Sequence, residues 1–141
     1  MLVRKSQAKW SGELKTGTGN IKLGSGAFEG KYSFTTRFEG APGTNPEELL
    51  AAAHAGCYSM AFNLMLSMAG FNSEYVDTTV EVNMDKVGAG MAIVGAKIIT
   101  KAKVPSITAA QFAEIAENAK QNCIISKALS IPMTLDATLV A

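Results

Sequence analysis

The sequence from Pro46 to Gly70 reads PEELLAAAHAGCYSMAFNLMLSMAG, and it decides the fold expected for the rest of the chain. Proline fits the first position of a helix, where its missing N–H is not needed. Asn45 stands before it as an N-cap and Glu48 is the third helical residue, which gives an Asx form of the capping box. Gly70 suits the C′ position that ends a helix. The sequence therefore predicts one helix from Pro46 to about Ala69.

The predicted helix is apolar nearly all the way round, and a stretch of this length could cross a membrane. We favour a soluble chain, because residues 49–53 are weakly lipophilic and no aromatic belt or basic flank marks either end. In a soluble protein such a helix is buried on all sides. Roughly 24 residues make a helix about 36 Å long. The short strands of one chain would struggle to cover that length, so we predict an intimate homodimer.

The bulk composition indicates one soluble domain spanning residues 1–141. Hydrophobic residues make up 48% of the chain and charged residues 18%, which argues against disorder. The net charge is +1 and the basic residues are spread along the chain, so no nucleic-acid partner is expected. Residues 1–6 lack the apolar core of a signal peptide. The expected location is the cytoplasm.

The flanking sequence predicts an α+β fold in the order β-β-β-α-β-β-α-α-β, with antiparallel sheets around the long helix. Alternation of apolar and polar residues, with glycines at the turns, predicts most of the strands. Gly88-Ala89-Gly90 indicates a hairpin turn, and Thr108 with Gln111 forms a second capping box. The predicted strands are 6–10, 21–23, 32–38, 76–87, 91–104 and 133–140, and the two later helices are about 109–121 and 124–129.

Two cysteines carry the chemical interest of the sequence. A cytosolic chain has little use for a structural disulfide, so Cys57 and Cys123 are buried filler, a metal site or a redox couple. Cys57 by itself favours a small buried hydrophobe, since activation in mid-helix needs a nearby cation. Cys123 stands at the start of a short helix, where the dipole stabilises a thiolate. His54 could complete a zinc site, but close Cys-x-x-Cys spacing is missing. We expect neither metal nor cofactor.

The candidate cation for Cys57 is Arg37. If Glu48 caps the helix, Glu47 is free to hold this arginine in a bidentate pair. The alternative is a solvated surface pair worth less than about 1 kcal/mol. Glu47 and Cys57 stand about 15 Å apart along one straight helix. They could share a site if two such helices packed across the two-fold axis of a dimer.

Several motifs together resemble the OsmC/Ohr family, the osmotically inducible and organic hydroperoxide resistance proteins. The likeness is nearest to the OsmC branch and runs nearly end to end. The motifs are Thr36-Arg37-Phe38-Glu39-Gly40, Gly43-Thr44-Asn45-Pro46-Glu47-Glu48-Leu49, Ala52-Ala53-His54-Ala55-Gly56-Cys57, Met84-Asp85-Lys86-Val87, and a final cysteine followed by Ser126-Lys127.

The resemblance implies a thiol peroxidase that works as an interwoven homodimer, with its active sites at the subunit interface. Cys57 would be the peroxidatic cysteine and Cys123 the resolving one. Arg37 and Glu47 would match the pair that activates the thiolate and orients the peroxide. Many members place proline after the second cysteine, where this chain has Ile124. The apolar residues around the helix, including Met60, Phe62, Met65 and Phe71, could favour organic hydroperoxides over hydrogen peroxide, or could simply be core packing. The reductant is an external dithiol, for which the resemblance suggests a lipoyl type.

Two other classes of function remain open from the residues alone. One is a small-ligand binding or carrier module, with a buried central helix and inert thiols. The other is a thioesterase-like helix wrapped by a sheet, for which Glu47 would supply the carboxylate at a helix N-terminus. Reaction of the thiols with a hydroperoxide separates the first from a peroxidase, and an acyl-CoA assay tests the second.

Overall fold

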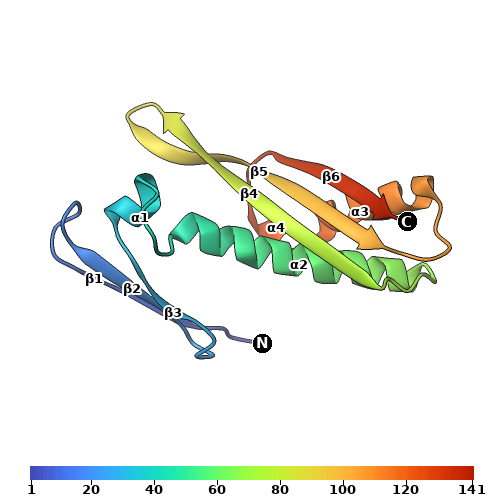
Figure 1. The fold of residues 1–141 in the computed structure, drawn as a ribbon, viewed down its shortest axis with the longest axis horizontal. Helices are drawn as coiled ribbons and strands as arrows, with labels where there is room; N and C mark the ends of the chain where they lie inside the picture. The colour runs from blue at the N-terminus through green and yellow to red at the C-terminus, as the bar shows by residue number, and fades with distance from the viewer. The chain divides into compact units, whose positions relative to one another are not determined.

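The computed structural model describes all residues from Met1 to Ala141. They form two compact parts, Met1–Leu49 and Leu50–Ala141, each of which has its own three-stranded sheet. The element order is mixed α and β, so the predicted α+β class is confirmed. The colours of Figure 1 follow the chain through these elements from the N-terminus to the C-terminus.

The first part is an antiparallel sheet followed by a short helix. Its strands are β1 (Ser6–Ser11), β2 (Thr18–Leu23) and β3 (Glu29–Tyr32), paired in that order. Strand β2 begins three residues earlier than predicted and includes Gly19, which pairs with both Trp10 and Tyr32. A Cβ at position 19 would overlap the Tyr32 ring, so only glycine leaves room for the ring at this position of the strand.

The predicted strand over residues 32–38 is wrong for most of its length. β3 ends at Tyr32, and residues from Phe34 to Phe38 form helix α1. Ser33 is the N-cap: its hydroxyl accepts from the Thr36 backbone N–H, and the Thr36 hydroxyl accepts from the Ser33 N–H. The rings of Phe34 and Phe38 stack with centroids 5.0 Å apart, a spacing of one helical turn. This capping box decides the local structure over the alternating pattern.

The second part pairs a long helix with a sheet of three strands. Helix α2 (Pro46–Met68) starts in the first part and has most of its length in the second. Figure 1 shows it running alongside the sheet. The other elements are β4 (Tyr75–Val87), β5 (Gly90–Lys103), α3 (Ala109–Asn122), α4 (Ile124–Ala128) and β6 (Met133–Val140). Their bounds lie within one residue of the prediction.

The β5–β6 pairing departs from the expected antiparallel sheet. β4 and β5 form the predicted antiparallel hairpin, turning at Gly88 with a positive φ of 61°. β6 instead lies parallel to β5, from Ala96 opposite Met133 to Lys103 opposite Val140. Helices α3 and α4 form the connection between β5 and β6. They carry the chain back to the end of the sheet at which β5 begins, so β6 runs in the same direction as β5.

Helix α2 supplies one side of the core of the second part. Its buried residues, His54, Tyr58, Phe62 and Leu66, recur every four positions and so form one stripe. Tyr58, Phe62 and Leu66 pack with buried residues of β4, β5 and α3, which are Val80, Ala96, Ile98, Ala102, Phe112, Ala116 and Ala119. Within a single chain, helix α2 is therefore buried on one face and not on all sides.

The opposite face of α2 is apolar and exposed. Met60, Leu64 and Met68 retain 77%, 59% and 79% of their accessible surface. By length and composition, α2 is the one helix that could cross a membrane. Its buried stripe, however, belongs to the core of the second part.

Candidate active site

The structure brings the two cysteines together. Cys57 lies in the middle of α2, and Cys123 is the residue that ends α3 and begins α4. Their Sγ atoms are 2.9 Å apart, and both thiols are free. A disulfide bond is about 2.05 Å long, so the sulfurs need to approach by less than about 1 Å to form one. The two residues are placed to exchange between dithiol and disulfide.

The two thiols differ in access to solvent. Cys123 is 1% exposed, whereas Cys57 is partly exposed. The backbone N–H of Cys123 donates to the Ala119 carbonyl at 2.9 Å, which fixes the backbone of Cys123 at the end of α3. A small reagent from solvent therefore reaches Cys57 first. This order suits a first reaction at Cys57 and a second at Cys123.

The pKa of Cys57 is raised above its ordinary value within one chain. Burial is the main cause, followed by the hydrogen bond that the Cys57 thiol shares with Cys123, and the charge of Cys123 adds to the effect. Backbone N–H groups of Ile125 and Ile124, at the start of α4, donate towards the sulfur and act in the opposite direction. The chain by itself therefore stabilises the thiol of Cys57, and a thiolate there needs a further positive group.

Arg37 and Glu47 form the bidentate pair expected from the sequence. The Arg37 Nε donates to both Glu47 carboxylate oxygens at 3.1 and 3.2 Å, and Nη2 donates to Oε1 at 2.6 Å. Glu47 is the more enclosed partner, with side-chain exposures of 11% for Glu47 and 39% for Arg37. The guanidinium also lies 5.1 Å from the centre of the Phe38 ring. The arginine is thus fixed in orientation and remains accessible.

The start of α2 frees Glu47 in the way the sequence predicts, with one difference in detail. Asn45 accepts a hydrogen bond from the Glu48 backbone N–H at 2.7 Å, as an N-cap does. The Glu48 carboxylate accepts from the Thr44 hydroxyl at 2.9 Å, so Thr44 takes the place expected for the Asn45 backbone. Both partners of Glu48 lie within the cap, which leaves Glu47 for Arg37.

The four predicted site residues therefore form two pairs. Arg37 pairs with Glu47 in the first compact part, and Cys57 pairs with Cys123 in the second. That these pairs combine into one active site stays a prediction.

A buried histidine lies beside the cysteines, where the sequence analysis weighed His54 only as a zinc ligand. His54 is fully buried, and its Nε2 shares a hydrogen bond of 2.7 Å with the Ser126 hydroxyl. Its Nδ1 is buried with no partner. Burial lowers the pKa of His54 and so favours the neutral form of the ring. In the sequence, His54 precedes Cys57 by three residues and Ser126 follows Cys123 by three, but this spacing alone does not show that the two side chains meet.

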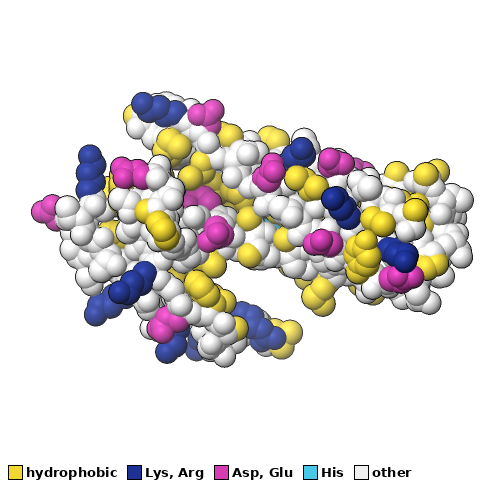
Figure 2. Space-filling view, in the orientation of Figure 1, with side chains coloured by type: hydrophobic (Ala, Val, Ile, Leu, Met, Phe, Trp, Pro, Cys, Tyr) yellow, Lys and Arg dark blue, Asp and Glu magenta, His cyan; other side chains and the backbone are white.

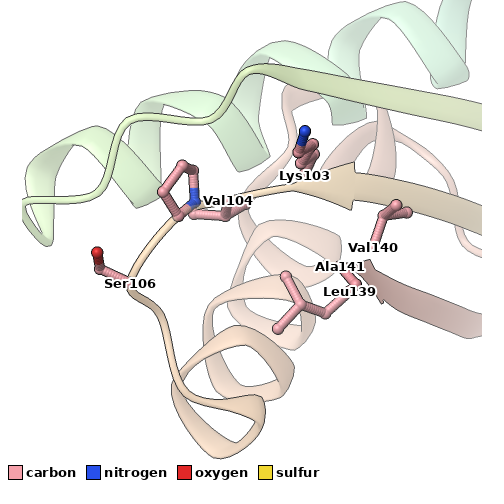
Figure 3. A pocket seen from close by; sticks show the side chains of 7 residues that line it. Lys103, Val104, Ser106, Leu139, Val140 and Ala141 are labelled. Carbon is pink, nitrogen blue, oxygen red and sulfur yellow. The ribbon is translucent and has the colours of Figure 1, made fainter.

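A separate cavity of about 460 Å³ lies where β5 and β6 end and holds none of the predicted site residues. It is lined by Lys103, Val104, Pro105, Ser106, Leu139, Val140 and Ala141, most of which are labelled in Figure 3. Lys103 is engaged in an ion pair with Glu74 at 3.1 Å. No hydrogen bond joins Lys103 to the Ser106 hydroxyl, so the cysteine pair remains the candidate for chemistry.

The surface adds no strongly charged site on the face that Figure 2 draws. Lys and Arg side chains there alternate with Asp and Glu, and hydrophobic side chains lie open between them. No three His, Cys, Asp or Glu side chains gather in a way that could hold a metal ion.

Comparison with known proteins places these features in a family. The family model described as OsmC-like protein matches residues 38–137. Peroxiredoxin OsmC of Escherichia coli (strain K12) is 47% identical over 134 residues, covering 94% of each chain. Organic hydroperoxide resistance protein-like 2 of Staphylococcus epidermidis (strain ATCC 12228) is 33% identical over 105 residues, covering 71% of each.

Solved structures share the fold at lower identity. An organic hydroperoxide resistance protein OsmC from Legionella pneumophila superimposes with a TM-score of 0.75 at 19% identity, covering 99% of this chain and 100% of the other. An OsmC-like protein from Mycoplasma pneumoniae gives a TM-score of 0.78 at 13% identity, covering 99% of each chain. The family match, the identity to curated relatives and the shared fold agree: this chain belongs to the OsmC-like family.

Proposed function

We propose that the chain is a cysteine-based peroxidase that reduces organic hydroperoxides, with Cys57 as the peroxidatic cysteine and Cys123 as the resolving cysteine. The observation that supports this most directly is the 2.9 Å separation of the two sulfurs, one partly exposed and the other buried. The names of its relatives, a peroxiredoxin and an organic hydroperoxide resistance protein, point to the same activity.

The first half-reaction oxidises Cys57. Its thiolate attacks the distal oxygen of the hydroperoxide, the O–O bond breaks, and the leaving alkoxide takes a proton to become an alcohol. Cys57 is left as a sulfenic acid. Hydrogen-bond donors aimed at the leaving oxygen stabilise the charge that develops there.

The second half-reaction uses Cys123. Its sulfur attacks the sulfenic sulfur, the S–S bond forms, and the hydroxyl leaves as water. An external dithiol then reduces the disulfide by exchange, which restores both thiols and leaves the dithiol oxidised. A lipoyl-type dithiol is the class we propose for this step.

Arg37 is the proposed cation for the Cys57 thiolate and for the leaving oxygen. Glu47 occupies Nε and Nη2 of the guanidinium, which leaves the remaining nitrogen for substrate or thiolate. Some such cation is required, because burial and Cys123 raise the pKa of Cys57 within the chain. Glu47 and Cys57 are separated by ten residues of helix α2, about 15 Å of axis. A second chain would bring the pair of one α2 beside the cysteine of the other.

The homodimer is therefore part of the proposal. Its support is the exposed apolar stripe on α2 formed by Met60, Leu64 and Met68, a surface that monomeric soluble proteins seldom leave open. In a dimer this stripe is covered by the partner, and α2 becomes a central helix buried on all sides. We also propose a single domain over residues 1–141, since helix α2 begins in the first compact part and continues into the second, and a cytoplasmic location.

The activity is tested by turnover. Purified protein should consume cumene hydroperoxide in the presence of dihydrolipoamide, and more efficiently than it consumes hydrogen peroxide. Cys57→Ser should abolish consumption. A carrier module with inert thiols would consume neither peroxide, with or without the substitution.

A further inference from the structure

Two hydrogen bonds between side chains connect α2 with the segment that begins at Cys123, and only one of them involves the cysteines. Cys57 meets Cys123 at 2.9 Å, and three residues earlier on α2 His54 meets Ser126 at 2.7 Å. Both helices use a spacing of three residues, which places the two members of each helix on one face. The His54–Ser126 hydrogen bond therefore lies next to the Cys57–Cys123 pair.

Helix α4 has few stabilising interactions of its own. It is five residues long, too short for stability of its own. Its N-cap, Cys123, makes no side-chain capping hydrogen bond. Ser126 is its only buried residue, Ile125 is partly buried against the core, and Ile124 is 75% exposed. The bond between Ser126 and His54 is the one side-chain hydrogen bond from α4 to α2, beside the backbone N–H groups of Ile124 and Ile125 that donate towards Cys57.

His54 depends on the same bond. Its ring is fully buried and its Nδ1 has no partner, so Ser126 is the sole hydrogen-bond partner of the side chain. Moving α4 away would leave both ring nitrogens buried without partners, which is strongly unfavourable. The neutral histidine thus resists any displacement of the segment that carries Cys123.

We propose that the His54–Ser126 hydrogen bond is a positioning device that holds Cys123 against Cys57 for disulfide formation. This inference rests on the proposed function. The step it serves is the attack of the Cys123 sulfur on the Cys57 sulfenic acid, in which the S–S bond forms, the S–O bond breaks and water leaves. A second hydroperoxide competes for the same sulfenic acid and would convert it to a sulfinic acid. Precise placement of the second thiol decides that competition, because proximity governs the rate of the intramolecular step.

The test follows one turnover in Ser126→Ala, with Ser59→Ala as a matched control. Ser59 also lies on α2 and makes a side-chain hydrogen bond of 2.8 Å, but to Thr78 of β4. Each protein receives one equivalent of cumene hydroperoxide. Loss of hydroperoxide measures the first step, and rapid quench with mass spectrometry measures the disulfide and the sulfinic acid.

We expect Ser126→Ala to slow disulfide formation about tenfold or more relative to the first step, since a misplacement of about 1 Å can cost ~10²-fold. Sulfinic acid at Cys57 should rise accordingly under excess hydroperoxide. Ser59→Ala should keep the wild-type ratio of the two rates. An unchanged ratio in Ser126→Ala, or an equal fall in Ser59→Ala, would overturn the positioning role.

A second pair of variants separates positioning from general loss of stability. The amide nitrogen of glutamine reaches the place of histidine Nε2, whereas that of asparagine reaches the place of Nδ1. His54→Gln should therefore preserve the ratio and His54→Asn should lose it. Equal behaviour of these two variants contradicts the proposal even if Ser126→Ala fails to fold. A wild-type protein that forms no Cys57–Cys123 disulfide would instead overturn the proposed function.

Discussion

Arg37 is the residue on which the reactivity of Cys57 depends in our account. Its guanidinium is held by three hydrogen bonds to the Glu47 carboxylate. Lysine carries the same charge but lacks the planar fork that takes both carboxylate oxygens at once. Replacing Arg37 by lysine therefore tests whether the orientation of the guanidinium matters in addition to its positive charge.

Arg37→Lys should lower kcat/KM for cumene hydroperoxide about tenfold or more, because the ammonium cannot satisfy Glu47 and the reacting oxygen together. Arg4→Lys is the matched control, since Arg4 is exposed and bonds only to the carbonyl of Val3. Steady-state kinetics of both variants give the comparison. Equal efficiency of the two would remove Arg37 from the mechanism.

His54 should make the stability of the protein depend on pH in a defined window. Burial holds its pKa below the ordinary value of 6.5, so the unfolded chain binds a proton that the folded chain does not. The free energy of unfolding is then not reduced by His54 above pH 6.5. It falls as the pH drops below 6.5, by at most about 1.4 kcal/mol per pH unit.

Urea unfolding of the wild type and of His54→Gln between pH 5 and 7.5 checks this slope. The variant has no proton to bind at that position, so its stability should fall less steeply than that of the wild type. Parallel pH profiles for the two proteins would show that His54 is not held neutral by burial.

Helix α3 carries the cap that is easiest to test, because it lies outside the proposed site. Thr108 and Gln111 satisfy each other's backbone N–H groups. Thr108→Ala should lower the free energy of unfolding by about 1 kcal/mol, whereas Thr108→Ser should recover most of it. Peroxidase turnover at 25 °C should not change. Equal stability of all three proteins in urea would contradict the capping argument.

The elements also show where sequence reasoning succeeds and where it fails. The bounds of α2 follow from Pro46 and Gly70, and those of the β4–β5 hairpin from Gly88, because caps and turns are local. Ser33 with Thr36 was an equally local signal, which the alternation of aromatic residues obscured. The parallel direction of β6 was open to prediction from the two helices before it.

The contacts of the candidate site also differ in whether the local sequence predicts them. The Arg37–Glu47 pair was predictable, because the cap at Asn45 assigns Glu48 elsewhere. The His54–Ser126 bond was not, since it joins residues 72 positions apart through burial that no local pattern encodes. Such a long-range polar contact depends on how α4 packs against α2, and the short helix α4 has little sequence signal of its own.

At the scale of the whole molecule, the exposed stripe on α2 should be an interface. Leu64→Glu would place a charge in the middle of this stripe and should convert a homodimer into monomers with reduced activity. Leu14→Glu alters an exposed leucine outside the helices and strands and serves as control. Size exclusion with light scattering should give twice the mass of one chain for the wild type and for the control. A wild-type monomer at micromolar concentration would contradict the dimer.

The central claim is that Cys57 and Cys123 are one redox couple, and a thiol count after one turnover tests it most directly. The wild type should lose both thiols after one equivalent of cumene hydroperoxide and yield a peptide in which Cys57 and Cys123 are linked. Cys57→Ser should retain its remaining thiol. Two intact thiols in the wild type, with the hydroperoxide left unconsumed, would contradict the account.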